Sequence, residues 1–130
     1  MSVVTQISVT LENRKGALAE LCSELARVAV NISAIYAEEE SKATGLVRLI
    51  VGQPETARRV LASLKLKFTE EDVLAVKVGD RPGALGKLTR KMAEKGINIH
   101  YAYGSIARGS SQALIILSVS DVAAAARVAK

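Results

Sequence analysis

The sequence predicts an α+β protein made of two βαββαβ units side by side, each an antiparallel sheet with helices on one face. Two observations predict it. The chain repeats itself at an offset of 67 residues, and each copy arranges strand-like and helix-like segments in the same order. We therefore expect a first unit at 1–70 and a second unit at 71–130, which is C-terminally short and lacks its last strand.

The internal repeat is strongest near the start of each unit. Between positions 9 and 36, ten of 28 residues are identical to the residue 67 positions later. They fall at turns and apolar positions, as a duplicated fold requires. Beyond residue 50 the match continues at an offset of 68, so we expect one inserted residue in a loop. The identical pairs are Val9 and Val76, Arg14 and Arg81, Gly16 and Gly83, Ala17 and Ala84, Leu18 and Leu85, Leu21 and Leu88, Ala26 and Ala93, Asn31 and Asn98, Ile32 and Ile99, and Tyr36 and Tyr103.

The first unit contains segments of two kinds. β-Branched residues mark strands, and apolar residues three and four apart mark helices. The second helix begins at Gln53-Pro54, with Pro54 near its first turn. The apolar face of the first helix is expected to hold Leu18, Leu21, Leu25 and Val28, joined by Cys22, Ala26 and Ala29. Strands are expected at 3–11, 31–37, 46–51 and 65–69, with a hairpin at 41–44. This order is that of ferredoxin-like folds.

The second unit has the same order but stops early. Its first strand is expected at 74–78, and Leu85, Leu88 and Met92 form the apolar face of its first helix. Gly96 ends that helix, where a left-handed residue is favoured. The first unit has Ala29 there, so its helix is expected to end differently. The last helix, 122–130, leaves no final strand, so either a neighbouring chain supplies one or the edge stays short and basic.

Composition narrows the class of protein. Three Tyr, one Phe and no Trp indicate an aliphatic core. A single cysteine, Cys22, excludes an intrachain disulfide and a cysteine zinc site, and we expect it to be a small core filler. No signal peptide and no apolar run of the ~20 residues that cross a membrane is visible, so a cytoplasmic protein without membrane contact is expected. The net charge of +5 is concentrated in the second half and is most often solvated surface.

Two turns, at 13–18 and 80–85, carry the candidate chemistry. Each joins a first strand to a first helix, with the sequences Asn-Arg-Lys-Gly-Ala-Leu and Asp-Arg-Pro-Gly-Ala-Leu. One interpretation is structural: Asn13 and Asp80 cap the helices, worth about 1 kcal/mol, and Pro82 suits a first helical turn. The other is functional, because free N–H groups at a helix start hold a carboxylate and glycine permits close approach. Turn chemistry alone favours capping, but the recurrence of the turn with an Asn-Ile strand favours a ligand site.

The pattern N/D-R-x-G-A-L, followed after a helix by Asn-Ile, resembles the ACT domain, known from the regulatory domains of phosphoglycerate dehydrogenase and aspartokinase. The resemblance covers nearly the whole chain twice, is strongest at 72–103, and is closest to stand-alone tandem ACT proteins with no attached enzyme. It implies units that pair side by side, joining sheets and packing first helices. Small ligands, usually amino acids, then lie where the turn of one unit faces the second strand of its neighbour.

The resemblance also implies roles for individual residues. It implies that Asn13 and Asp80 orient the ligand and that Gly16 and Gly83 let it approach the backbone closely. It also implies that N–H groups at the helix start come from Ala17, Leu18, Ala84 and Leu85. The facing wall of the site is implied to consist of Asn31, Ile32, Asn98 and Ile99. Lys15 stands where the family usually has the proline found at Pro82, so the first turn is expected to be looser. Asp80 is expected to favour an ammonium group and repel a carboxylate, so the two sites need not be equivalent.

The remaining polar residues indicate no catalytic, metal or cofactor site. His100 is the only histidine, which excludes most catalytic triads. A structural or exposed role is favoured over a pH-sensing role in the pocket. Tyr36 and Tyr103 are expected in a core or interface. The run 38–40, three glutamates, is expected to be a solvated hairpin tip. No Gly-rich phosphate loop is present.

The expected function is therefore that of a non-enzymatic regulatory protein that binds a small or hydrophobic amino acid and modulates a partner enzyme. A homodimer or higher homo-oligomer is expected, because tandem pairing leaves sheet edges to cover. The alternative is a nucleic-acid-binding module, since RNA-recognition domains share the βαββαβ order. Strands 46–51 and 113–118 lack the aromatic residues that such domains stack on bases, so we expect no nucleic acid partner. A small acylphosphatase-like enzyme is least favoured, because its anion-loop pattern is missing.

Overall fold

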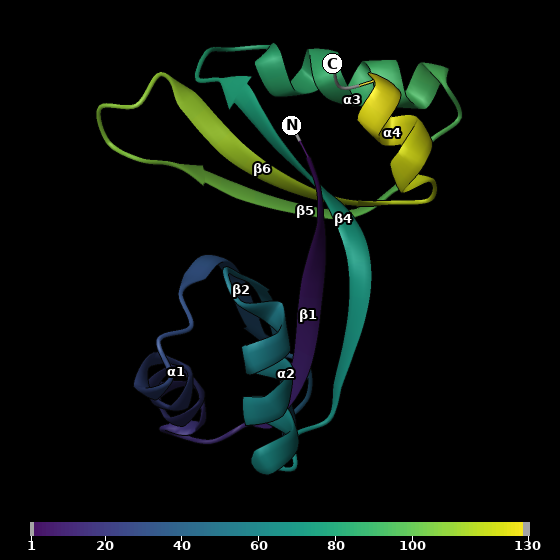
Figure 1. Cartoon of the computed structure of the whole chain (residues 1–130). Helices are drawn as coiled ribbons and strands as arrows, with labels where there is room; N and C mark the ends of the chain where they lie inside the picture. Colours follow the sequence, from purple (N-terminus) through teal and green to yellow (C-terminus); the bar gives the residue numbers. More distant parts are fainter. Residues whose placement is uncertain (1, 129–130) are drawn as a thin grey trace. The chain divides into compact units, whose positions relative to one another are not determined.

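A computed structural model describes residues 2–128 and has six strands and four helices in that range (Figure 1). The strands form one sheet in the order β2-β3-β1-β4-β6-β5. The predicted α+β class with a βαββαβ-like order is confirmed. The elements are β1 Ser2–Glu12, α1 Ala17–Arg27, β2 Ile32–Glu39, β3 Thr44–Val51, α2 Pro54–Ser63, β4 Phe68–Gly79, α3 Ala84–Glu94, β5 Ile99–Ile106, β6 Gln112–Val119 and α4 Val122–Val128.

The chain forms two compact units, and β1 and β4 are divided between them. The first unit is Thr5–Glu71, and the second consists of the described residues among 1–4 and 72–130. The strand order is β2-β3-β1-β4 in the first unit and β1-β4-β6-β5 in the second. In the second unit the described residues end with α4, Val122–Val128. The start of β1 from the same chain lies beside β4 in this unit, at the position of a fourth strand, where we expected a neighbouring chain or a short, basic edge.

The connection between the repeats differs from the expectation. We expected two strands, at 65–69 and 74–78, but β4 is a single strand of 12 residues. Lys65 is not extended: its φ of 57° is left-handed, and its N–H donates to the Ala62 carbonyl to close α2. The polar run 69–72 has the composition of a linker, yet it continues the strand, because β1 lies alongside and pairs with its backbone.

The core of the first unit lies between one face of its sheet and the helices α1 and α2. Alternate residues of β1 and β3 point to that face, and every fourth residue of α1 covers it. Burial of each large aliphatic side chain contributes roughly 1.5–3 kcal/mol. Leu18 and Val28 were expected on this face but are both 38% exposed, so the buried stripe of α1 is narrower than predicted. The buried residues are Ile7, Val9, Leu11, Ala17, Leu21, Leu25, Val30, Val47, Leu49, Val51, Ala57, Val60 and Leu61.

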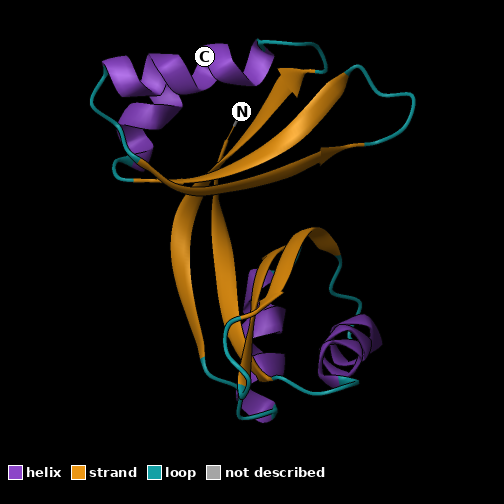
Figure 2. Cartoon of the chain, turned by 180° about the vertical axis from the view of Figure 1, so that it is seen from behind, coloured by secondary structure: helices purple, strands orange, loops and turns teal. Residues whose placement is uncertain are grey.

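The second unit repeats this packing with α3 and α4 on one face of its strands (Figure 2). Leu88 and Met92 are buried as expected, whereas Leu85 is 43% exposed. Its core is smaller, because α4 has seven residues and contributes one fully buried side chain, Ala125. The last two residues of the helix expected at 122–130 lie outside the described range.

The helices α1 and α3 end in the same way, which corrects the expectation for α1. Gly96 has a φ of 71° as predicted, but Ala29 has a φ of 59° in the same position. In both helices the second residue after the cap donates back across the last turn, from Val30 to the Leu25 carbonyl and from Ile97 to the Met92 carbonyl. Ala29 therefore holds a conformation that costs an L-residue about 1 kcal/mol or more.

Candidate functional site

The first turn is closed by glycine and not by an asparagine cap. Gly16 is the N-cap residue of α1, with a φ of 87° that favours glycine, and no side chain caps the helix. The side-chain amide of Asn13 instead donates to the Ser41 carbonyl at 2.9 Å, and the backbone N–H of Asn13 donates to the Ala43 carbonyl. The capping role considered for Asn13 is therefore wrong: this residue ties the turn to the β2–β3 hairpin.

The second turn has the same backbone. Gly83 is the N-cap residue of α3 with a φ of 88°, again without a side-chain cap, so the capping role considered for Asp80 is also wrong. The backbone N–H of Asp80 donates to the Ser111 carbonyl, while its carboxylate is exposed. Pro82 precedes the N-cap residue, so it lies outside the first helical turn where it was expected.

Both turns leave backbone donors free at the helix start. In α1 the Ala17 N–H reaches the Arg14 carbonyl at 3.3 Å and the Glu20 N–H reaches the Gly16 carbonyl at 2.9 Å. Leu18 and Ala19 lie between these two residues, and within the described chain their backbone N–H groups have no acceptor. The same holds for Leu85 and Gly86 in α3. Such donors, at the positive end of a helix, favour an anionic group.

A hollow of about 260 Å³ lies beside the first turn, within the first unit. Three of the predicted site residues line it: Asn13, Ala17 and Leu18. The acidic residues Glu38 and Glu39 line it too, at the end of β2, although we expected them at a solvated hairpin tip. The other lining residues are Leu11, Glu12, Arg14, Ala37, Gly45 and Val47.

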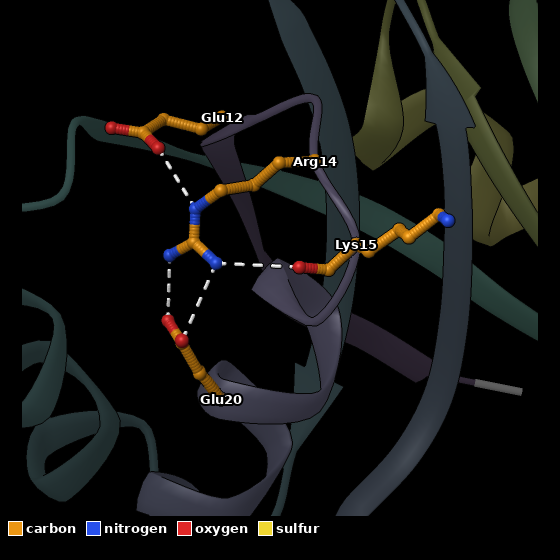
Figure 3. A network of polar contacts seen from close by, with 4 residues as sticks. All are labelled: Glu12, Arg14, Lys15 and Glu20. Atoms are coloured by element: carbon orange, nitrogen blue, oxygen red, sulfur yellow. Dashed lines mark hydrogen bonds and ion pairs between the residues drawn. The ribbon is translucent and has the colours of Figure 1, made fainter.

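An arginine clamp holds the same turn together (Figure 3). The Arg14 guanidinium donates to Glu12 at 2.8 Å and to both carboxylate oxygens of Glu20 at 2.7 and 3.3 Å, and it also donates to the Lys15 carbonyl. The hydrogen bonds that Arg14 donates lower the pKa of Glu20, and the same bonds to Glu20 and Glu12 raise the pKa of Arg14. Arg14 is therefore paired within the protein, and Glu39 is the acidic residue at the end of β2 that lies on the same face of the sheet as Ala37 and Val47.

The carboxylate of the neighbouring Glu38 lies on the opposite face of the sheet, beside a tyrosine. The Tyr36 hydroxyl donates to Glu38 at 2.9 Å, and this hydrogen bond raises the pKa of Tyr36 above its ordinary value. The sequence pattern of residues 38–40 indicates only a run of surface charges.

The strand topology brings this run to the first turn. The strands β1 and β2 both pair with β3 antiparallel to it, so the end of β2 and the end of β1 lie at the same end of the sheet.

The predicted facing wall lies away from the turn within each unit. Asn31 and Ile32 stand at the start of β2, whereas its last residues line the hollow. The Asn31 N–H donates to the Gln53 side chain, and the Asn98 N–H to Ser120, so both asparagines mark where a second strand meets a second helix. Ile32 and Ile99 pack against their cores. The turn and the Asn-Ile strand of one unit do not form one site.

The second unit has a hollow of about 200 Å³ on a different side of its first helix. Of the predicted residues only Ala84 lines it. Its charged residues are Arg81, Lys87 and Lys91. His100 is exposed on β5, and no group of three metal-ligating side chains occurs among residues 2–128. Over the same residues, no helix is long and apolar enough to span a membrane.

The repeated β–α–β–β–α order, with a glycine at the N-cap of the first helix of each unit, defines a pair of ferredoxin-like units. A family model for the ACT domain pair matches residues 1–128. The chain belongs to the ACT domain pair family, which confirms the resemblance seen in the sequence.

Solved structures agree on the fold. A protein from Bacteroides thetaiotaomicron is similar at a TM-score of 0.89 and 28% identity, over 97% of this chain and 85% of that one. The regulatory subunits of aspartate kinase from Thermus thermophilus and Thermus flavus have TM-scores of 0.69 and 0.67 and identities of 17% and 15%, each over 96% of this chain and 89% of the other. No protein of curated function matches the sequence.

Proposed function

We propose that this protein is a cytoplasmic regulatory protein that binds a small amino acid at the β1–α1 turn and thereby modulates a partner enzyme. The observation that carries the proposal is the pairing of opposite recognition groups in the first hollow. Leu18 at the helix start and the acidic residue Glu39 at the end of β2 line the same hollow of about 260 Å³.

The chemistry of these groups suits a zwitterion. The unpaired N–H groups at the start of α1 attract the carboxylate of an amino acid. The carboxylate of Glu39 attracts its ammonium group, and the side-chain carbonyl oxygen of Asn13 adds an acceptor. Leu11, Ala17 and Val47 supply apolar walls. A hollow smaller than the ~300–1,000 Å³ typical of drug-sized ligands favours a small or hydrophobic amino acid.

The regulatory part of the proposal rests on membership of the ACT domain pair family and on exposed apolar surface. In this interpretation the sequence units 1–70 and 71–130 are two ACT domains, and copies of the chain associate as a homodimer or larger homo-oligomer. Leu18, Leu85 and Ile35 are 38%, 43% and 44% exposed, and β2 and β5 are the two edges of the sheet. Association places Asn31 and Ile32 of one copy opposite the turn of another, and a ligand there favours one arrangement of subunits.

The test is thermal stability of the purified protein against each of the twenty amino acids. A ligand at a hundredfold excess over its Kd is expected to add about 2.7 kcal/mol to the free energy of unfolding. Glu39→Gln is expected to weaken the response to any hit at least fivefold, because it removes a charge that faces the ammonium group. Glu40→Gln is the matched control, since Glu40 is the adjacent carboxylate and lies outside the hollow.

Two outcomes count against this proposal. A flat panel at millimolar concentrations removes amino-acid binding as the function. If Glu39→Gln and Glu40→Gln weaken the response to an amino acid equally, the binding site is not at the first turn. Asp80→Ala then tests the second turn, where loss of the response places the ligand in the second unit.

A further inference from the structure

The arginine clamp of the first unit has no counterpart in the second, although its arginine does. Arg81 stands at the repeat position of Arg14, at the same point of the same glycine-closed turn. Each carboxylate that holds Arg14 is replaced. Glu12 corresponds to Gly79 and Glu20 corresponds to Lys87. The second unit therefore has the same turn and the same arginine, but it lacks the two carboxylates that neutralise the guanidinium in the first unit.

The charge change continues along the helix. Glu24, one turn beyond Glu20, corresponds to Lys91. Arg81, Lys87 and Lys91 all line the hollow of about 200 Å³ in the second unit, whose floor includes Val78, Leu88 and Val128. Among the residues that the structure describes, 2–128, no acidic residue lines this hollow. Among residues 2–128, none of its three cations has an ion pair, whereas Arg14 has two.

Arg81 lies where a small residue leaves it room. One guanidinium nitrogen of Arg81 is 2.7 Å from the point where a Cβ on Gly79 would sit. The side chain therefore folds back over the end of β4, much as Arg14 reaches back to Glu12 at the end of β1. Gly79 makes space at the place where the first unit has its own carboxylate.

The net charge of the protein belongs entirely to the second unit. Residues 5–71 contain nine Lys and Arg against nine Asp and Glu, whereas the rest of the chain contains nine against four. The four acidic residues of the second unit are Asp72, Asp80, Glu94 and Asp121, and none of them lines the hollow. Three like charges gathered in one small hollow repel one another, and an external anion relieves that repulsion.

We propose that this hollow is an anion site for a compact dianion, the phosphate group of a small phosphorylated ligand. The Arg81 guanidinium takes two phosphate oxygens in the forked geometry that Arg14 uses on Glu20, and Lys87 and Lys91 act as point charges. A dianion matches three cations better than a single carboxylate does. The site is separate from the amino-acid hollow of the first unit, and the inference stands whether or not that proposal holds.

The test is a titration of the whole protein with inorganic phosphate and with glycerol 3-phosphate, at constant ionic strength and followed by ¹H–¹⁵N NMR. Saturable shifts are expected at Arg81 Nε–H and at the amides of Lys87 and Lys91. Arg81→Gln is expected to weaken binding about tenfold, as removal of a charge-assisted hydrogen bond does. Arg90→Gln removes one charge from the same helix outside the hollow, and less than a twofold change is expected.

A second variant keeps the test decisive if Arg81→Gln folds poorly. Lys87→Glu restores the carboxylate that the first unit has at this position, so Arg81 is expected to pair internally and phosphate binding to be lost. Equal weakening by Arg81→Gln and Arg90→Gln would show a diffuse charge effect and overturn the site. Shifts that do not saturate, or tighter binding of the dicarboxylate succinate than of phosphate, would overturn the ligand class. Amino acids are absent from this experiment, so its result is independent of the amino-acid panel.

Discussion

Arg14 and Glu20 face each other across the β1–α1 turn through two hydrogen bonds of 2.7 and 3.3 Å, while their repeat equivalents Arg81 and Lys87 are both cations. One duplicated turn thus exists in two electrostatic forms. The first form is closed by its own carboxylates, and the second presents unneutralised positive charge.

The closed form predicts an acid-sensitive carboxylate. The pKa of Glu20 is lowered from its ordinary value of 4.5, chiefly by the hydrogen bonds from Arg14. Because the folded-state pKa is the lower one, the stabilisation is present above pH 4.5 and is lost as the pH falls through the folded pKa. A carboxyl NMR titration is expected to find Glu20 below 4.5 and to find it near that value in Arg14→Gln. An unshifted Glu20 in the wild type contradicts the clamp.

The left-handed alanine predicts a stabilising substitution. Ala29 has a φ of 59° at the position that Gly96 occupies in α3, so Ala29→Gly is expected to raise the free energy of unfolding by about 1 kcal/mol. Gly96→Ala is the matched reverse change and is expected to lower it by a similar amount. Chemical denaturation measures both. The same sign for the two substitutions would exclude the shared helix ending.

A crowded glycine predicts a destabilising substitution. A Cβ on Gly104 would sit 2.5 Å from the Leu114 carbonyl oxygen in the paired strand β6. Gly104→Ala is therefore expected to cost about 1–3 kcal/mol, because backbone must move. Gly86→Ala, in the helix α3 with nothing within 4 Å of the added Cβ, is expected to stabilise by up to about 1 kcal/mol. Thermal denaturation of the two variants is expected to shift in opposite directions.

The exposed leucines predict a change in oligomeric state. Leu18 and Leu85 occupy equivalent places on α1 and α3 and are 38% and 43% exposed. If first helices pack together between copies, Leu18→Glu combined with Leu85→Glu is expected to yield monomers in sedimentation experiments. Val3→Glu is the control, because Val3 is a similarly exposed apolar residue on a strand. A wild-type monomer at micromolar concentration would remove this part of the proposed function.

Local patterns predicted most of the elements, and the exceptions have physical causes. The αL ending of α3 was visible in Gly96, because glycine carries no steric penalty there. The same ending at Ala29 was not, because it depends on Val30 being drawn into the core, where it is 5% exposed. The buried faces of α1 and α3 were overestimated, since Leu18 and Leu85 fit the helical period but the sheet below covers only part of it.

The candidate site was predicted in part. The glycine-closed turns were evident from the repeat, and Asn13, Ala17 and Leu18 do line a hollow. Glu38 and Glu39 were missed, because a run of glutamates has no periodicity that separates a pocket wall from a solvated loop. The basic hollow was also missed, although the substitutions of Glu12 and Glu20 by Gly79 and Lys87 are readable in the repeat once the Arg14 clamp is known.

The sequence by itself determined the doubled βαββαβ order, the aliphatic core and the two glycine turns, because short-range periodicity and backbone preference are properties of neighbouring residues. Only the tertiary structure decided that β4 runs unbroken through the boundary and that residues 2–4 belong with the second unit. Both depend on the pairing of β1 with β4, whose residues are more than fifty positions apart. Strand partners at such separation are selected by the register of the whole sheet, and no local pattern encodes that choice.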